Sequence, residues 1–305
     1  MTPETPDSLP ITEQENLNTA DLSSQSTREI VRLMNEEDAL VAPAIGLVVP
    51  EIVEAVDGIF SRLSSGGRLF YIGTGTSGRL GVLDAAECPP TFGVSPELVQ
   101  AVIAGGYEAC YRAVEASEDD AEAGANDLKS RGFSKADALV GIAASGSTPY
   151  TVGAVAFARA LGAFTVALTC APHSPITKAA EVTIVPVVGP EVIAGSTRLK
   201  AGTAQKMVLN MISTATMTKL GYVTGNRMTN VQTRNSKLRA RAIRILTGET
   251  GLEERNASEV LEKANGNLPA ALLMAKTGCS LEDAERALLD SRGALSQAES
   301  MLADG

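Results

Sequence analysis

The stretch Arg68-Leu-Phe-Tyr-Ile-Gly-Thr-Gly-Thr-Ser-Gly78 decides the fold of this 305-residue chain. Its first half is a short apolar run that has glycines on both sides, which is typical of a buried strand. Its second half is rich in glycine and hydroxyl groups, and helical character resumes from Arg79 to Cys88. A glycine-rich turn between a strand and a helix leaves backbone N–H groups free at the start of the helix, where the helix dipole favours an anion.

The same alternation of strand and helix recurs along the chain. We expect further strands over residues 98–103, 138–142, 164–169 and 182–188, and helices over residues 27–34, 52–63, 150–161 and 197–220. Ser26 and Glu29 resemble a capping box at the start of the first of these helices. Strands that alternate with helices predict an α/β fold, in which a doubly wound, mostly parallel sheet has helices on both faces.

Composition changes at both ends of the chain. Residues 1–25 are polar and are predicted to form an N-terminal arm, mobile at least over residues 1–20. Residues 26–249 form the α/β domain and end in a basic amphipathic helix. Residues 250–305 lack strand signals, are rich in Ala, Leu and Glu, and predict a small domain of three helices.

The bulk properties disfavour several classes of function. A formal net charge of -10 would repel nucleic acid and anionic membranes. We expect neither a membrane span nor a signal peptide, so the cytoplasm is the expected location. The four scattered cysteines favour neither a zinc site nor a disulfide framework. The single histidine, His173, lies in a predicted loop, which disfavours a histidine-based triad.

Three segments have the potential to hold a phosphate group: residues 73–78, 145–149 and 195–202. The first also matches Gly-x-Gly-x-x-Gly, which leaves a dinucleotide site as an alternative. Such a site usually has an acidic residue at the end of the next strand, but here Glu97 precedes that strand. Hydroxyl groups suit a terminal phosphate, so a phosphosugar is favoured, and simple tight turns remain the other alternative.

Several long motifs, in the same order, resemble those of the N-acetylmuramic acid 6-phosphate etherases, which have the sugar isomerase (SIS) fold. The motifs are Thr76-Ser-Gly-Arg-Leu-Gly81, Ala86-Glu-Cys-Pro-Pro-Thr-Phe92, Ser145-Gly-Ser-Thr-Pro-Tyr150 and Gly195-Ser-Thr-Arg-Leu-Lys-Ala-Gly-Thr-Ala-Gln-Lys206. The resemblance covers residues 12–245, and the tail resembles a small ubiquitin-associated-like (UBA-like) helical domain. The chain is more weakly similar to the glucokinase regulatory protein.

The resemblance implies a reaction. The substrate is a phosphosugar that carries D-lactate as an ether on C3, and the products are N-acetylglucosamine 6-phosphate and D-lactate. Cleavage proceeds by elimination from the ring-opened sugar, followed by addition of water. These steps require two proton-transfer groups and neither a redox cofactor nor a metal. The fold also implies a homodimer, because a single SIS unit usually builds its site at a dimer interface.

The family's two acidic residues match Glu87 and Glu118. We expect Glu87 to protonate the departing lactate and Glu118 to act as the base or to activate water. Glu87 is expected to be buried beside Cys88 and the two prolines that follow, which would keep it protonated; a solvated surface position is the alternative. For Glu118, a charged helix face with Glu115, Asp119 and Asp120 is the alternative.

The predicted phosphate ligands are hydroxyl side chains of the first two loops: Thr76, Ser77, Ser145, Ser147 and Thr148. The lactyl carboxylate requires a cation, for which the candidates are Arg198, Lys200, Lys206 and Arg79; a role in surface solubility is the alternative for each. The chain departs from the family at Thr74 and Ser117, where Ala is frequent. It also has Ser147 where Arg is frequent, which removes a positive charge.

Two other functions stay open on these grounds. Another SIS enzyme, an aldose–ketose phosphosugar isomerase, would also remove the C2 proton but would release no lactate. A non-catalytic phosphosugar sensor would need neither Glu87 nor Glu118, so the presence of both favours the enzyme.

Overall fold

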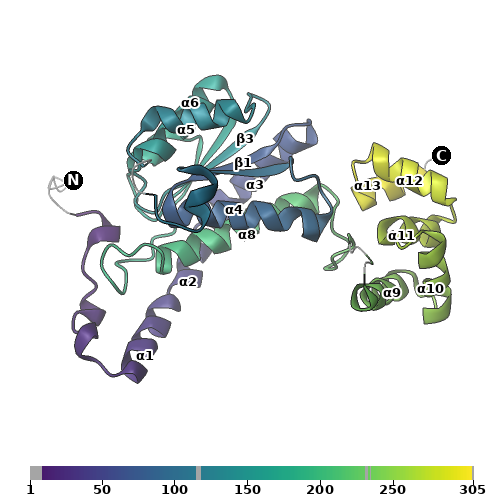
Figure 1. Cartoon of the computed structure of the whole chain (residues 1–305), viewed down its shortest axis with the longest axis horizontal. Coiled ribbons are helices and arrows are strands. Elements are labelled where there is room, and N and C mark those ends of the chain that lie inside the picture. Colours follow the sequence, from purple (N-terminus) through teal and green to yellow (C-terminus); the bar gives the residue numbers. More distant parts are fainter. Residues whose placement is uncertain (1–8, 115–117, 231–232, 234, 304–305) are drawn as a thin grey trace. The chain divides into compact units, whose positions relative to one another are not determined.

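A computed structural model of the chain (Figure 1) describes residues 9–114, 118–230, 233 and 235–303. The chain divides into two compact units, Met1–Ala85 with Glu97–Ser213, and Ala86–Pro96 with Thr214–Gly305. Within the described residues, no single helix is long and apolar enough to cross a membrane. The segments Thr27–Gly46 and Val49–Ser64, which are bent against each other, have the required length and composition only when they are counted together.

The first unit contains the predicted parallel sheet. Its strands are β1 (Leu69–Gly73), β2 (Val99–Ile103), β3 (Ala138–Ile142), β4 (Phe164–Leu168) and β5 (Val182–Ile184), in the order β2-β1-β3-β4-β5. All neighbouring strands are parallel, which confirms the α/β prediction. β5 is shorter than predicted; Pro186, which follows it, cannot donate a hydrogen bond to a neighbouring strand.

Some of the helices over residues 27–219 cover the two faces of this sheet. The helices of this stretch are α1 (Thr27–Asp38), α2 (Val41–Gly46), α3 (Val49–Ser64), α4 (Gly75–Phe92), α5 (Ala121–Ser130), α6 (Pro149–Leu161), α7 (Pro175–Ala179) and α8 (Lys200–Lys219), with a 3-10 helix η4 at Gly106–Cys110. Phe70 and Ile72 of β1 pack into the core beneath α5 and α6, whereas Tyr71 faces α4. Figure 1 shows α5 and α6 on one face and α3, α4 and α8 on the other.

Helix α4 begins at Gly75, inside the predicted loop, and not at Arg79 as predicted. Gly75 has a φ of +49°, and a Cβ added at Gly78 would lie 2.7 Å from the Gly73 carbonyl oxygen. Only a residue without a side chain permits this approach of backbone to backbone. The glycines therefore let the helix start directly at the end of β1.

The described part of the N-terminal arm makes contacts that the prediction of a mobile segment did not anticipate. It forms three 3-10 helices, η1 (Ile11–Glu13), η2 (Leu17–Thr19) and η3 (Leu22–Ser24). Asn16 Nδ2 donates to the Pro190 carbonyl at 3.2 Å and Thr19 Oγ1 donates to the Val192 carbonyl at 2.9 Å. Ser26 caps α1 as predicted, since its Oγ accepts from the Glu29 amide.

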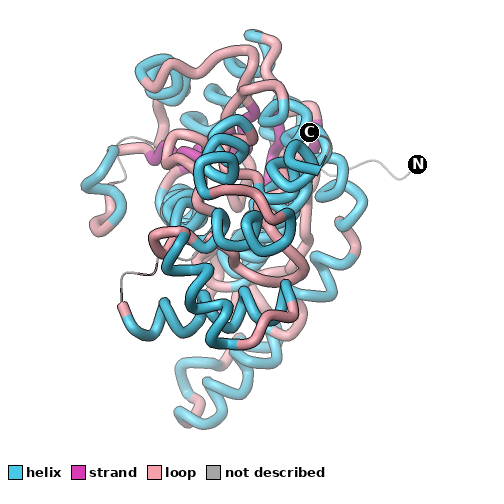
Figure 2. The backbone as a smooth tube through the Cα atoms, turned by 90° about the vertical axis from the view of Figure 1, so that its right-hand side faces the viewer, coloured by secondary structure: helices cyan, strands magenta, loops and turns pink. Residues whose placement is uncertain are grey.

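The second unit contains the helical tail. Its helices are α9 (Ser236–Thr250), α10 (Glu254–Lys263), α11 (Leu268–Thr277), α12 (Leu281–Asp290) and α13 (Leu295–Ala303), which Figure 2 draws in cyan. The described part of the tail after residue 250 therefore has four helices and not the predicted three. Ala242, Ile245 and Leu246 of α9 share its apolar core. The assignment of residues 250–305 to a separate UBA-like domain stays a prediction.

Candidate active site

The loops after β1 and β3 lie side by side at the carboxyl edge of the sheet. The two strands are hydrogen-bonded neighbours, and Gly73 pairs with Ile142. The chain leaves β1 for β2 on one side and then crosses to β3 on the other, which makes this edge a topological switch point, where open α/β sheets bind ligands. The amides in the first turn of α4, including those of Thr76 and Ser77, have no acceptor within the helix.

Glu118 lies between these two loops. Its Oε1 is 3.6 Å from the position of a Cβ added at Gly75, and its carbonyl oxygen accepts from the Tyr150 amide at 3.1 Å. Helix α5 begins only at Ala121 and is capped by the Asp120 side chain. The alternative of a charged helix face therefore does not apply to Glu118. Glu115 and Ser117 lie outside the described residues.

The second loop is shaped by Gly146. The Oγ atoms of Ser145 and Ser147 are 2.9 Å apart, and Ser147 is exposed. Thr148 is the residue at the N-cap of α6, but its hydroxyl does not cap the helix. The three hydroxyl groups predicted from this segment are thus gathered around one turn.

Replacing Gly146 by Ala is expected to disrupt this turn. Gly146 has a φ of +66°, and an added Cβ would lie 2.0 Å from Ser174 Oγ. The left-handed backbone alone costs about 1–2 kcal/mol, and the overlap adds about 1–3 kcal/mol. Gly132→Ala is the matched control, since its φ is +65° and nothing lies within 4 Å of its added Cβ. Urea unfolding of both variants measures the difference, and equal losses of stability would contradict the steric explanation.

The predicted ligand Ser77 is almost fully buried, and its hydroxyl donates to Gln205 Oε1 of α8 at 2.9 Å. Thr76 is half-buried, and its Cγ2 lies 3.5 Å from the position of a Cβ added at Gly202. The start of α8 therefore packs against the first turn of α4. The role of Gln205 was missed because nothing local to it marks this contact.

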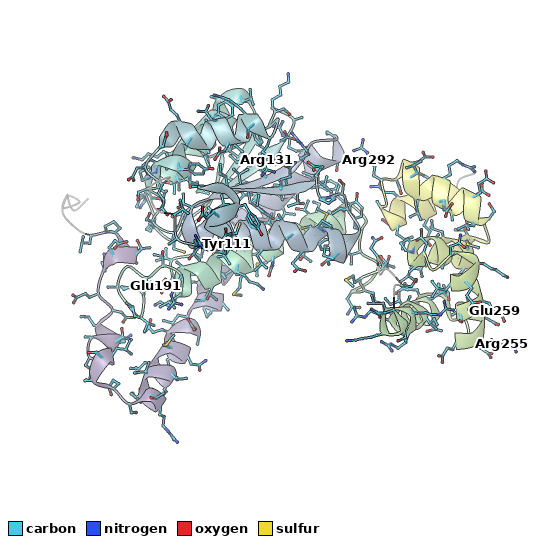
Figure 3. All side chains as sticks on the ribbon, in the orientation of Figure 1. Tyr111, Arg131, Glu191, Arg255, Glu259 and Arg292 are labelled. Carbon is cyan, nitrogen blue, oxygen red and sulfur yellow. The ribbon has the colours of Figure 1, made fainter. Side chains whose placement is uncertain are left out.

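The third segment differs from the other two. The amides of Lys200 and Ala201, which begin α8, each donate at 2.9 Å to the buried carboxylate of Glu191. Figure 3 shows Glu191 beside this first turn. Burial raises the pKa of Glu191, and the two amide hydrogen bonds oppose this only in part. These two amides are therefore occupied by a side chain of the protein itself.

The four candidate cations have different surroundings. The Lys200 ammonium is buried and pairs with Glu37 at 2.5 Å. Arg79 donates from Nε to the Ala109 carbonyl at 2.8 Å and from Nη2 to the Arg112 carbonyl at 2.7 Å. Arg198 and Lys206 are exposed. The latter two are therefore better placed to meet a ligand.

Glu87 is exposed, so the expectation that it is buried was wrong. The buried carboxylate of α4 is instead Asp84, which accepts from Tyr71 Oη at 2.8 Å, Asn210 Nδ2 at 2.6 Å and Ser213 Oγ at 3.1 Å. Burial raises the pKa of Asp84, and the three hydrogen bonds oppose this only in part. Its position four residues before the buried Cys88 was a helical-period signal that could have revealed it.

Two family models match parts of the chain. The SIS domain model matches residues 124–215, and the model described as the glucokinase regulatory protein N-terminal SIS domain matches residues 51–159. The phosphoheptose isomerase of Neisseria gonorrhoeae aligns with a TM-score of 0.47 and 18% identity, over 63% of this chain and 98% of that chain. The parallel sheet and the two matching family models together identify the chain as an α/β protein of the SIS fold.

Full-length relatives narrow the class. The N-acetylmuramic acid 6-phosphate etherase 2 of Vibrio cholerae serotype O1 is 50% identical over 94% of either chain. The N-acetylmuramic acid 6-phosphate etherase of Aeromonas hydrophila is 49% identical over 94% of this chain and 96% of its own. The chain belongs to the N-acetylmuramic acid 6-phosphate etherase family.

Proposed function

We propose that the protein cleaves the D-lactyl ether of N-acetylmuramic acid 6-phosphate and releases N-acetylglucosamine 6-phosphate and D-lactate, in the recycling of cell-wall amino sugars. The observation that carries this proposal is the position of Glu118 between two hydroxyl-rich loops at the carboxyl edge of the sheet. This arrangement brings a carboxylate next to the place where a phosphosugar would be anchored. The substrate and the four scattered cysteines favour a cytoplasmic location.

The chemistry follows from the fact that the lactate oxygen of an ether is a poor leaving group. Opening of the sugar ring yields an aldehyde at C1, which acidifies the proton on C2. The Glu118 carboxylate removes that proton, the C3–O bond breaks, and Glu87 gives a proton to the lactate oxygen. Water then adds its hydroxyl to C3 and a proton to C2 of the unsaturated aldehyde. Each transfer requires a group within about 3 Å of the proton concerned.

The binding roles are divided among the loops. Thr76 and Ser77 of the first loop, with Ser145, Ser147 and Thr148 of the second, hold the phosphate. The exposed side chains of Arg198 and Lys206 are the favoured partners of the lactyl carboxylate. Lys200 and Arg79, which are held by the protein, position the third segment and the chain around η4.

The geometry of α4 favours a site shared by two copies. Glu87 follows Gly75 by 12 residues on one helix, which is about 18 Å of rise and about a third of a turn around the axis. Glu118 lies at the Gly75 end. Paired carboxylates that act on one bond in glycosidases are about 5–10 Å apart. We therefore assign to each site of a homodimer the Glu118 of one copy and the Glu87 of the other.

Release of D-lactate tests the reaction. The protein is expected to release stoichiometric D-lactate from N-acetylmuramic acid 6-phosphate, and much less from the unphosphorylated sugar, because the phosphate anchors the substrate. An isomerase would convert an aldose phosphate to a ketose phosphate instead. A sensor would bind the substrate without turnover. Tight binding with no lactate would refute the etherase proposal.

A further inference from the structure

Gln205 has an unusual hydrogen-bonding state. Its side chain is 1% exposed, and its Oε1 accepts from Ser77 Oγ at 2.9 Å. Its Nε2 is buried and has no hydrogen-bond partner in the described part of the chain. A buried N–H group without an acceptor is rare in folded proteins and costs free energy. An unused N–H donor, Gln205 Nε2, therefore lies next to Ser77, a predicted phosphate ligand.

The Ser77 hydroxyl has only one hydrogen to give. A phosphate dianion is an acceptor only, so a serine that binds it must donate that hydrogen to it. In the present arrangement the hydrogen is donated to Gln205. Ser77 therefore cannot bind phosphate through its hydroxyl until Gln205 stops accepting.

Rotation of the Gln205 amide by half a turn about its last carbon–carbon bond resolves the conflict. The rotation exchanges Oε1 and Nε2, so that Nε2 donates to Ser77 Oγ and the serine hydrogen is free. The group left without a partner is then a carbonyl, which proteins tolerate better than an orphaned N–H. The rotation needs no movement of α8, which stays close to the loop because Gly202 has no side chain; a Cβ added there would lie 3.5 Å from Thr76 Cγ2.

We infer that Gln205 is a positioning residue whose amide orientation directs the Ser77 hydroxyl, and that a bound phosphate group selects the donating orientation. The inference rests on the proposed function only in that the first loop holds the substrate phosphate. It assigns to Gln205 a part in distinguishing phosphorylated from unphosphorylated sugars. It requires no contact between Gln205 and the substrate.

Two substitutions separate this role from simple packing. In Gln205→Glu both side-chain oxygens are acceptors, so the Ser77 hydrogen is donated to the carboxylate in either orientation. The Kd for N-acetylglucosamine 6-phosphate is therefore expected to rise about 10- to 100-fold. Gln205→Met has nearly the same shape and only a weak acceptor, the thioether sulfur, so the Kd should change by no more than about three-fold. Thr203→Glu, at an exposed position of α8, adds the same charge as a control and should leave the Kd unchanged.

The pH dependence of the Kd separates the two explanations, because a change in packing alone would not depend on pH. Protonation of the new glutamate restores a donor, so the Kd ratio of the Gln205→Glu variant to wild type should narrow as pH falls. Binding of N-acetylglucosamine 6-phosphate by calorimetry needs no catalysis, so its result is independent of whether lactate is released. Equal Kd values for the Glu and Met variants, or a ratio that does not change with pH, would overturn the inference.

A second measurement decides the question if the Gln205→Glu variant does not fold. In protein labelled with ¹⁵N at glutamine, the Gln205 side-chain amide resonance is assigned by its loss in Gln205→Met. Adding N-acetylglucosamine 6-phosphate should shift this resonance downfield as the amide begins to donate, and the shift should disappear in Ser77→Ala. An unchanged resonance in a phosphosugar-saturated wild-type protein would refute the rotation.

Discussion

Glu87→Gln and Glu118→Gln variants that are dissociated and reassembled together in equal amounts are expected to regain about one quarter of the wild-type rate of D-lactate release. Each variant alone should be slower than wild type by about 10²–10⁴-fold, because it lacks one proton-transfer group. Random reassembly makes about half of the dimers mixed, and each mixed dimer has one site in which both glutamates are present. Recovery in the mixture is therefore the signature of a shared site.

The controls exclude other sources of activity. A variant that carries both substitutions should restore nothing when it is mixed with either single variant. Asp119→Asn removes an exposed carboxylate next to Glu118 and should leave the rate unchanged. A mixture no faster than the single variants, in preparations shown to exchange subunits, would mean that the two glutamates act within one chain. Full activity of Glu87→Gln alone would refute its role as the acid.

Removing the buried partner of Lys200 is expected to cause the largest loss of stability. Glu37→Ala leaves the Lys200 ammonium, whose side chain is 1% exposed, without its counter-charge. Loss of one member of a buried ion pair costs about 3–5 kcal/mol, whereas replacing both members with apolar side chains of similar volume is often neutral. The double variant Glu37→Leu/Lys200→Met should therefore recover most of the free energy of unfolding, measured by urea denaturation.

A neighbouring residue supplies the control. Glu36 is exposed and pairs with Arg32 on the surface of α1, so Glu36→Ala should cost less than about 1 kcal/mol. A loss at Glu37 as small as the loss at Glu36 would show that the buried pair contributes little.

The pair also predicts how stability depends on pH. Burial alone would raise the pKa of Glu37, but hydrogen bonds from Lys200 and Asn18 outweigh it and hold the pKa below its ordinary value. The unfolded chain therefore binds a proton at Glu37 more readily than the folded chain does. The stabilisation is present above the unfolded pKa of about 4.3 and is lost as pH falls through the lower folded pKa. Glu37→Gln should flatten this acid limb, which denaturation at a series of pH values measures.

Much of the fold could be predicted because its signals are local. The apolar run before Gly73 predicted β1, and the same pattern predicted β3 and β4 to within one residue. The hydroxyl-rich loops after β1 and β3 were predicted for the same reason, whereas their position side by side depends on the strand order, which is not a local property. The predicted length of β5 was wrong although Pro186 is a local signal for its end, and the predicted number of helices in the tail was wrong as well.

The sequence by itself determined the α/β order, the two loops with their hydroxyl groups, and the family through its motifs. Only the tertiary structure decided which charged groups are buried or paired within the protein and which are exposed. Lys200 looked like any other candidate cation, yet it is neutralised by Glu37, which lies 163 residues earlier in the chain. The amides of the third segment are likewise occupied by Glu191, and Glu87 is exposed whereas Asp84 is buried. The physical reason is that burial and ion pairing depend on which residues the fold brings together, and neighbouring sequence carries no record of those partners.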